Sequence, residues 1–82
     1  MVTLFVVPNC PLCAHARAWL QQHGVAHVER DVASDFSALR AMYRLTRQGL
    51  VPVFATNRTA LVRPTEEALR EWLISSSAEF KL

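Results

Sequence analysis

A short apolar run near the start of the chain most constrains how this sequence can fold. The run covers residues 3–7, contains one phenylalanine and two valines, and ends at Pro8. A continuous run of this length and composition is typical of a strand that is buried on both faces. We therefore expect this strand to lie inside a sheet that is covered on both sides.

The segment after this run predicts a helix over residues 11–23 and then a second strand. Its apolar residues recur at helical spacing, at Leu12, Ala16, Trp19 and Leu20. Pro11 suits the first position of a helix, and Gly24 stands just past the expected end. Residues 25–32 are rich in β-branched side chains, which predicts a strand with one polar face.

A second helix and a third strand are predicted next. Ser34 or Asp35 can cap the helix, and Gly49 is expected to stop it. The residues expected to face the core from this helix are Phe36, Leu39, Tyr43 and Thr46. The chain must then become extended, because the residue before Pro52 is pushed out of the helical region. Residues 50–56 therefore predict a third strand.

The remaining segment predicts a hairpin and a last helix. A turn at residues 56–59 is short enough to make the next strand, residues 60–62, antiparallel to the third. Pro64 is expected to open the last helix. The inner face of that helix is expected to carry Leu69, Trp72 and Leu73. The order is βαβαββα, and a right-handed crossover of the first unit puts the first strand centrally in a small mixed sheet.

Length and composition limit the organisation of the chain and its class of function. Its 82 residues suffice for one compact domain, which we expect at residues 1–75, with a tail at residues 76–82. There is no apolar run near the roughly 18 residues of a membrane span and no recognisable signal peptide. We therefore expect a cytoplasmic protein, a monomer without a membrane partner. A net charge of +2 is too small to predict a nucleic-acid binder.

Both cysteines of the chain stand where the first strand gives way to the first helix. Cys10 is expected at the carboxyl edge of the sheet, where unpaired backbone N–H groups and the helix dipole favour a thiolate. Cys13 stands one helical turn further on, where it can attack a mixed disulfide formed at Cys10. The pair predicts thiol–disulfide exchange, with Cys10 as the nucleophile and Cys13 as the resolving thiol.

Other roles for the same spacing stay open. Cys-x-x-Cys also supplies half of a tetrahedral zinc site, but the nearest extra ligand is His15 and no second half is present, so we expect no bound metal or other cofactor. Attachment of c-type haem needs a histidine where Ala14 stands. Two buried structural thiols are a further alternative.

The chain resembles the glutaredoxin family of the thioredoxin-like superfamily over almost its whole length. The resemblance rests on the βαβαββα order and on two motifs, Pro-Asn-Cys-Pro-Leu-Cys at residues 8–13 and Val-Pro at residues 51–52. It implies a four-stranded mixed sheet flanked by three helices, a cis bond before Pro52, and reduction of protein or low-molecular-weight disulfides. It also implies a set of substrate-binding residues: Asn9, Pro11, Leu12, Val51, Pro52 and Arg63.

One departure from the family concerns the charge near the nucleophile. Many glutaredoxins carry a lysine where Val7 stands. The remaining cations that could stabilise the thiolate are His15 and Arg17. We therefore expect the pKa of Cys10 to be less depressed than in the lysine-bearing members.

A second departure concerns the electron donor. Glutathione-binding members have a glycine-rich turn before the last helix, whereas residues 61–65 contain no glycine. The Asn9-Cys10 and Arg63-Pro64 pairs are similar to those of redoxins that take electrons from thioredoxin reductase and serve ribonucleotide reductase. Glutathione and thioredoxin reductase both remain as expected electron donors. The expected partner is a disulfide-bearing protein, such as ribonucleotide reductase.

Residues 13–32 also resemble the first half of the Spx and arsenate-reductase-type family, whose members can act as redox-sensing transcriptional regulators. That family carries an inserted helical region before its final strands, whereas this chain passes directly from Thr46 to Val51. The alternative function is therefore a redox-sensing or thiol- or metal-binding adaptor that switches a protein partner.

Three arginines repeat along the second predicted helix. Arg40, Arg44 and Arg47 are spaced at i, i+4 and i+7, which places them on one side of a helix. This side is either a solvated face or, together with Arg63, a docking surface for an acidic partner.

Overall fold

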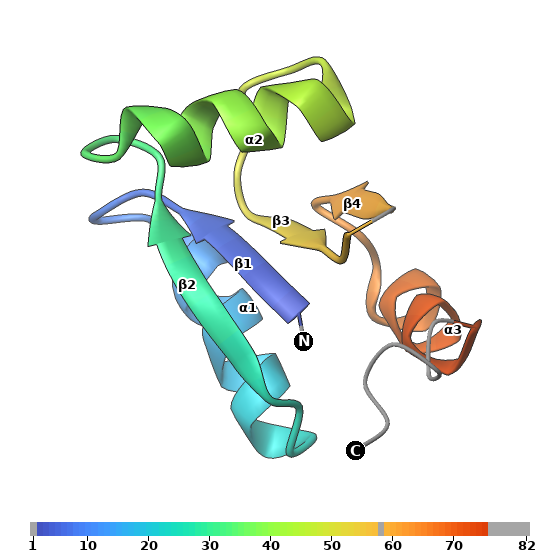
Figure 1. The fold of residues 1–82 in the computed structure, drawn as a ribbon. Helices are drawn as coiled ribbons and strands as arrows, with labels where there is room; N and C mark the ends of the chain where they lie inside the picture. Colours follow the sequence, from blue (N-terminus) through green and yellow to red (C-terminus); the bar gives the residue numbers. More distant parts are fainter. Residues whose placement is uncertain (1, 58, 76–82) are drawn as a thin grey trace.

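The computed structural model describes residues 2–57 and 59–75, and its elements follow the predicted order βαβαββα (Figure 1). Their bounds are β1 (Val2–Val6), α1 (Pro11–Gln22), β2 (His27–Asp31), α2 (Phe36–Thr46), β3 (Val53–Ala55), β4 (Ala60–Val62) and α3 (Glu66–Ser75). No helix among these residues is long and apolar enough to cross a membrane. The predicted tail, residues 76–82, lies outside the described residues.

The four strands form one mixed sheet in the order β2-β1-β3-β4. β1 pairs in parallel with β2, where Leu4 lies opposite Glu29, and antiparallel with β3, where Leu4 lies opposite Phe54. β3 and β4 form an antiparallel hairpin. The predicted central position of the first strand, the parallel first unit and the hairpin are all confirmed.

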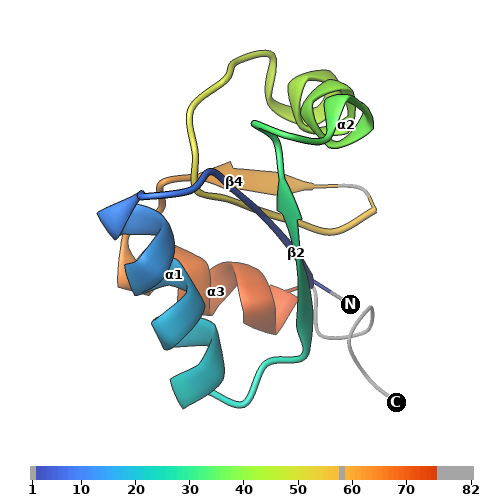
Figure 2. The same ribbon diagram turned by 90° about the vertical axis from the view of Figure 1, so that its left-hand side faces the viewer.

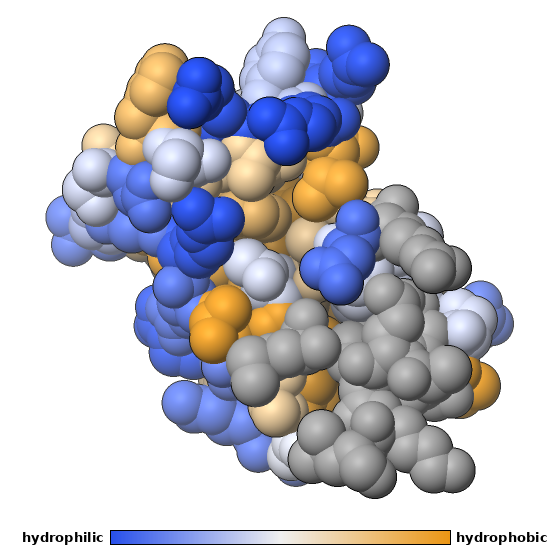
Figure 3. Space-filling model, in the orientation of Figure 1, coloured by the Kyte–Doolittle hydropathy of each residue, from blue (hydrophilic) through white to orange (hydrophobic). Residues whose placement is uncertain are grey.

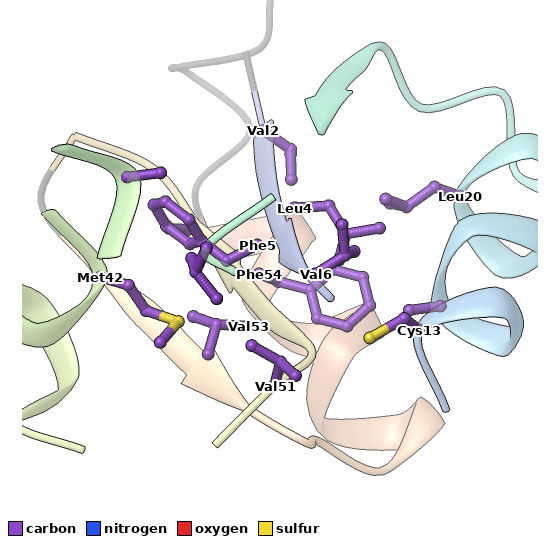
Figure 4. Packing of buried hydrophobic residues seen from close by; sticks show 14 of the residues in the cluster. Val2, Leu4, Phe5, Val6, Cys13, Leu20, Met42, Val51, Val53 and Phe54 are labelled. Carbon is purple, nitrogen blue, oxygen red and sulfur yellow. The ribbon is translucent and has the colours of Figure 1, made fainter. Parts of the chain in front are cut away.

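Helices cover both faces of the sheet. α1 and α3 lie on one face and α2 lies on the other (Figures 1 and 2). In Figure 4, Cys13 and Leu20 of α1 approach β1 from one side, whereas Met42 of α2 lies on the side of Phe5 and Val53. The buried residues of β1 are Val2, Leu4, Phe5 and Val6. The apolar run is therefore buried on both faces, as its composition predicts.

α1 begins at Pro11, as predicted, and ends one residue earlier than predicted. Its last residue is Gln22, and the chain leaves the helix through Gly24, whose φ of 64° lies in the left-handed region that glycine adopts without steric cost. Val25 still donates its backbone N–H to the carbonyl of Leu20, at 2.9 Å. This bond belongs to the helix end, so β2 begins later than predicted.

The buried face of α2 differs from the prediction. Ala38 and Met42 are 0% exposed, whereas Phe36 and Tyr43 are 69% and 53% exposed. The predicted core positions are therefore wrong for the two aromatic residues. Asp35 caps the helix, and its carboxylate accepts two backbone N–H groups of the first turn at 3.0 and 3.2 Å. With the helix starting there, its small residue Ala38 faces the sheet and permits close packing.

α2 also ends before Gly49. Arg47 takes the left-handed conformation, with a φ of 60°, and donates its backbone N–H to the carbonyl of Tyr43 at 2.7 Å. The hydroxyl of Thr46 donates to the carbonyl of Met42 at 2.9 Å. These bonds satisfy carbonyls of the last turn, and the helix is stopped by a residue other than glycine.

The first strand of the hairpin and the last helix are both shorter than predicted. β3 covers only Val53–Ala55 of the expected residues 50–56. Pro64 precedes α3 and does not open it, because the helix is capped by Thr65, whose hydroxyl accepts the N–H of Ala68 at 3.1 Å. The predicted inner face is confirmed by packing against the core at Leu69, Trp72 and Leu73.

Met42→Ala should destabilise the fold by about 2–5 kcal/mol, because it opens a cavity in a closed core. Tyr43→Ala, one residue away on the exposed side of the same helix, should cost less than about 1 kcal/mol. Urea unfolding followed by circular dichroism measures both values. A cost for Tyr43→Ala equal to that for Met42→Ala would show that the buried face of α2 is wrongly assigned.

Candidate active site

Cys10 caps the N-terminus of α1 with its sulfur. Its backbone is extended, with φ −114° and ψ 107°, and its Sγ accepts the N–H of Cys13 at 3.1 Å. Asn9 has a φ of 58°, a left-handed conformation that asparagine tolerates better than most residues. This residue turns the chain from β1 into the helix. The thiol therefore occupies the place that a serine or aspartate oxygen takes in most helix caps.

The two thiols have different surroundings. Cys10 is half-buried at the helix end, and Cys13 is 1% exposed in the core. A hydrogen bond from the thiol of Cys13 lowers the pKa of Cys10, and burial is the main cause that raises the pKa of Cys13. As the pH rises, Cys10 is therefore the first of the two to become a thiolate.

Arg63 connects the β4–α3 turn to the loop before β3. The Val51–Pro52 peptide bond is cis, as the family resemblance implied. Arg63 Nε donates to the carbonyl of Val51 at 2.7 Å, and its backbone N–H donates to the carbonyl of Pro52 at 3.1 Å. Hydrogen bonds to the sulfur are the largest causes that lower the pKa of Cys10, and the positive charge of Arg63 lowers it further. One residue thus holds the loop and supplies a cation to the site.

Arg17 does not take the position beside Cys10 that the sequence suggested. Its guanidinium forms a two-point ion pair with the carboxylate of Glu29 on β2, with Nη2 and Oε1 at 2.8 Å. This pairing raises the pKa of Arg17 and lowers the pKa of Glu29. The charge of Arg17 acts on the buried Cys13, whereas Arg63 acts on Cys10. The cation that acts on the nucleophile Cys10 is therefore Arg63 of the β4–α3 turn, which is distant from Cys10 in the sequence.

A groove of about 330 Å³ includes in its lining Leu12, which stands directly before Cys13 in the sequence, although neither cysteine lines it. Three of the predicted substrate-binding residues line it: Leu12, Pro52 and Arg63. It continues between α1 and α3 over residues that were not among the predicted substrate-binding residues, including Ala16, Trp19, Gln22, Glu66 and Leu69. The α1 residues could have been found from their positions four, seven and ten residues after Leu12, which place them on the same side of the helix.

The other residues that the sequence singled out lie around this groove. Asn9 and Pro11 are exposed and flank Cys10 without lining the groove. Val51 is buried and presents its carbonyl to Arg63. His15, considered above as an extra metal ligand, lines the groove. Within residues 2–57 and 59–75, no three or more His, Cys, Asp or Glu side chains cluster in a way that could hold a metal ion.

The fold and the capping cysteine define a thioredoxin-like α/β protein. The chain is similar to the crystal structure of a variant of the thioredoxin-like protein BC3987, with a TM-score of 0.80 and 22% identity over 89% of this chain and 99% of that one. A crystal structure of a glutaredoxin from Archaeoglobus fulgidus gives a TM-score of 0.77 and 19% identity, covering 85% of this chain and 82% of that one. The family model of glutaredoxin matches residues 2–60, and the chain belongs to the glutaredoxin family.

Curated relatives extend the similarity to a class of regulators. The global transcriptional regulator Spx of Bacillus subtilis is 36% identical over 59 residues, which cover 68% of this chain and 45% of that protein. The Staphylococcus aureus protein of the same name is 34% identical over the same shares of the two chains. The chain thus spans less than half the length of these relatives. The resemblance to Spx that the sequence indicated at residues 13–32 extends over 59 residues.

Cys13→Ala should raise the pKa of Cys10, because it removes the thiol that donates to Cys10 Sγ and leaves only backbone donors. Cys13→Ser should raise it less, because a hydroxyl can replace that donor. The ultraviolet absorbance of the thiolate, followed against pH in each variant, measures both pKa values. An unchanged pKa in Cys13→Ala would contradict the role of this hydrogen bond.

Arg63→Ala should destabilise the fold by about 1 kcal/mol, because the carbonyl of Val51 loses its side-chain donor. The pKa of Cys10 should also rise, because a nearby positive charge is lost. Arg70→Ala, which removes an exposed arginine from α3, is the matched control and should change neither property. Urea unfolding and thiolate absorbance measure the two effects, and equal behaviour of both variants would contradict the role of Arg63.

Proposed function

We propose that this glutaredoxin-family domain is a thiol–disulfide oxidoreductase that reduces protein or low-molecular-weight disulfides through Cys10 and Cys13. The observation that carries the proposal is the unequal environment of the two thiols. Cys10 is partly exposed and caps α1, whereas Cys13 is buried and donates a hydrogen bond to it. One accessible thiolate beside one protected thiol suits an exchange reaction, because the attack then begins at a defined sulfur.

In the first step, the Cys10 thiolate attacks one sulfur of the substrate disulfide. A bond forms between Cys10 Sγ and that sulfur, the S–S bond of the substrate breaks, and the second substrate sulfur leaves as a thiolate that takes up a proton. The N–H of Cys13 and the charge of Arg63 favour the thiolate before the attack. The groove beside Leu12 and Pro52 offers a surface for the group attached to the attacked sulfur.

In the second step, Cys13 loses its proton and its thiolate attacks Cys10 Sγ. The Cys10–Cys13 disulfide forms, the substrate sulfur leaves as a thiolate, and two electrons have passed from the dithiol to the substrate. Besides burial, the hydrogen bond to Cys10 and the negative charge of Cys10 raise the pKa of Cys13. Both of these causes disappear once Cys10 is part of a mixed disulfide, so the resolving thiol is activated only after the first step.

The oxidised pair must then receive two electrons from an external thiol. We propose that the electron donor is thioredoxin reductase rather than glutathione. Residues 61–65 have no glycine, and the turn they form directs Arg63 toward the carbonyl of Val51. The glycine-rich turn that receives glutathione in other members therefore has no counterpart in sequence here.

The second candidate function is a redox sensor that switches a protein partner. The observation that favours it is the similarity to proteins named global transcriptional regulator Spx. In a sensor, the same chemistry would convert Cys10 and Cys13 to a disulfide once per oxidation event, without continued turnover. The two candidates use the same cysteines and differ in whether the disulfide is rapidly reduced again.

The rate of NADPH consumption during reduction of a protein disulfide distinguishes the two candidate functions and the two candidate electron donors. We expect NADPH to be consumed continuously with thioredoxin reductase and slowly, or not at all, with glutathione and glutathione reductase. Cys10→Ser should reduce the rate to background. The reaction of the Cys13→Ser variant should stop once each chain has formed one mixed disulfide with the substrate, and mass spectrometry detects this adduct. Stoichiometric oxidation without turnover under either electron supply would contradict the oxidoreductase and favour the sensor.

A further inference from the structure

The outer side of α2 carries two aromatic residues and two arginines, and a third arginine, Arg47, caps the end of the helix. We call it the aromatic–arginine face, and its members are Phe36, Arg40, Tyr43, Arg44 and Arg47. At 100° per residue their positions fall within about a third of the helix circumference. The side opposite to it buries Ala38 and Met42 against the sheet. Strongly hydrophilic and hydrophobic side chains lie next to one another over α2 in Figure 3.

The side chains of this face have no carboxylate partner within the described part of the chain. Phe36 is 69% exposed, Tyr43 is 53% exposed, and the arginines are also exposed. The guanidinium of Arg40 lies over the ring of Phe36, 5.4 Å from its centroid, at the distance of a cation–π contact. No ion pair joins any of the three arginines to an acidic residue there.

The composition of this face is unusual for a helix surface that only meets water. Solvated helices commonly carry lysine and glutamate at spacings of three and four, which pair with each other. α2 contains no lysine, glutamate or aspartate. Arginine, tyrosine and phenylalanine are instead the residues enriched in the cores of protein interfaces, where lysine and glutamate are depleted.

We infer that the aromatic–arginine face docks a protein partner whose own surface presents carboxylates around an apolar centre. Arginine forms two-point hydrogen bonds with carboxylates, and the exposed rings of Phe36 and Tyr43 supply apolar area that such a partner would cover. The three positive charges stand on one helix and its C-terminal cap, in a chain whose net charge is only +2. They would therefore also steer an acidic partner to this face.

Two other occupants fit the face less well. A second copy of the chain would bring three arginines against three arginines in a symmetric contact, which like-charge repulsion opposes. A single-stranded nucleic acid would stack its bases on exposed rings in a basic groove. Here the Arg40 guanidinium already covers one face of the Phe36 ring, and the groove described above lies between α1 and α3, on the other side of the sheet.

The docking face leads directly, along the chain, into the Val51–Pro52 loop that Arg63 holds. After Arg47, the chain passes through the exposed Leu50 to the buried Val51–Pro52 bond, which Arg63 holds. In Figure 2 this segment descends from α2 toward the end of the sheet where α1 begins. Arg63, which the sequence grouped with the other arginines, belongs to the cysteine site and not to this face. The inference concerns α2 alone and does not rest on the proposed reaction.

A nuclear magnetic resonance titration of the full chain tests the inference. The probe is a synthetic amphipathic helical peptide with glutamates around a row of leucines, and its matched control has glutamine in place of every glutamate. We expect the acidic peptide to shift the backbone amide signals of α2, with binding that weakens as salt is added. Arg40→Glu/Arg44→Glu should weaken this binding about tenfold or more, whereas Arg70→Glu on α3 should not.

Several outcomes would overturn the inference. They are the absence of shifts on α2 with the acidic peptide, equal binding of the glutamine peptide, and tighter binding of an oligothymidine to the same face. The dispersion of the amide spectrum reports whether each variant is folded. If the glutamate variant does not fold, Arg40→Gln/Arg44→Gln removes the two charges without reversing them, and equal binding by that variant would contradict the inference. Loss of disulfide reduction in Cys10→Ser leaves these results unchanged, so the two proposals fail separately.

Discussion

The hydrogen bonding of β1 on both of its edges fixes where the helices, the hairpin and the cysteine pair lie. The strand pairs in parallel with β2 and antiparallel with β3, and helices cover both of its faces. A mainly apolar strand suits that position, because four of its five side chains, Val2, Leu4, Phe5 and Val6, are buried. Its carboxyl end therefore leads directly to the point where α1 begins, and Cys10 lies there as the cap of the helix.

Two parts of the chain that are far apart in sequence meet at this point. The first is the start of α1, which supplies both thiols and the N–H that Cys10 Sγ accepts. The second is the hairpin, which carries Arg63 to the Val51–Pro52 bond. The sheet order places β3 beside β1, so the hairpin brings a positive charge to a site that has none next to the thiolate in sequence. The same architecture leaves α2 on the opposite side of the sheet, where its aromatic–arginine face is available to a partner.

The element order, the central strand and the capping cysteine could be predicted because each depends on local patterns of apolar residues, prolines and glycine. The buried face of α2 could not, because Phe36 is more hydrophobic than Ala38, and only packing against the sheet favours the smaller residue. The cation at Cys10 was missed for a related reason. Arg17 is near in sequence but pairs with Glu29, whereas Arg63 reaches the site only through the tertiary fold. Local spacing in the sequence indicates the helices and strands, whereas contacts between these elements determine which charged side chain lies near Cys10.

The fold makes Cys10 the reactive thiolate and protects Cys13. Brief alkylation of the reduced chain with iodoacetamide over a range of pH, followed by mass mapping of the peptides, is the test of this difference. We expect Cys10 to be modified while Cys13 is spared, and we expect the rate to fall only below a pH lower than the pKa of an ordinary cysteine, because protonation then removes the thiolate. Equal modification of both thiols, or earlier modification of Cys13, would contradict this expectation.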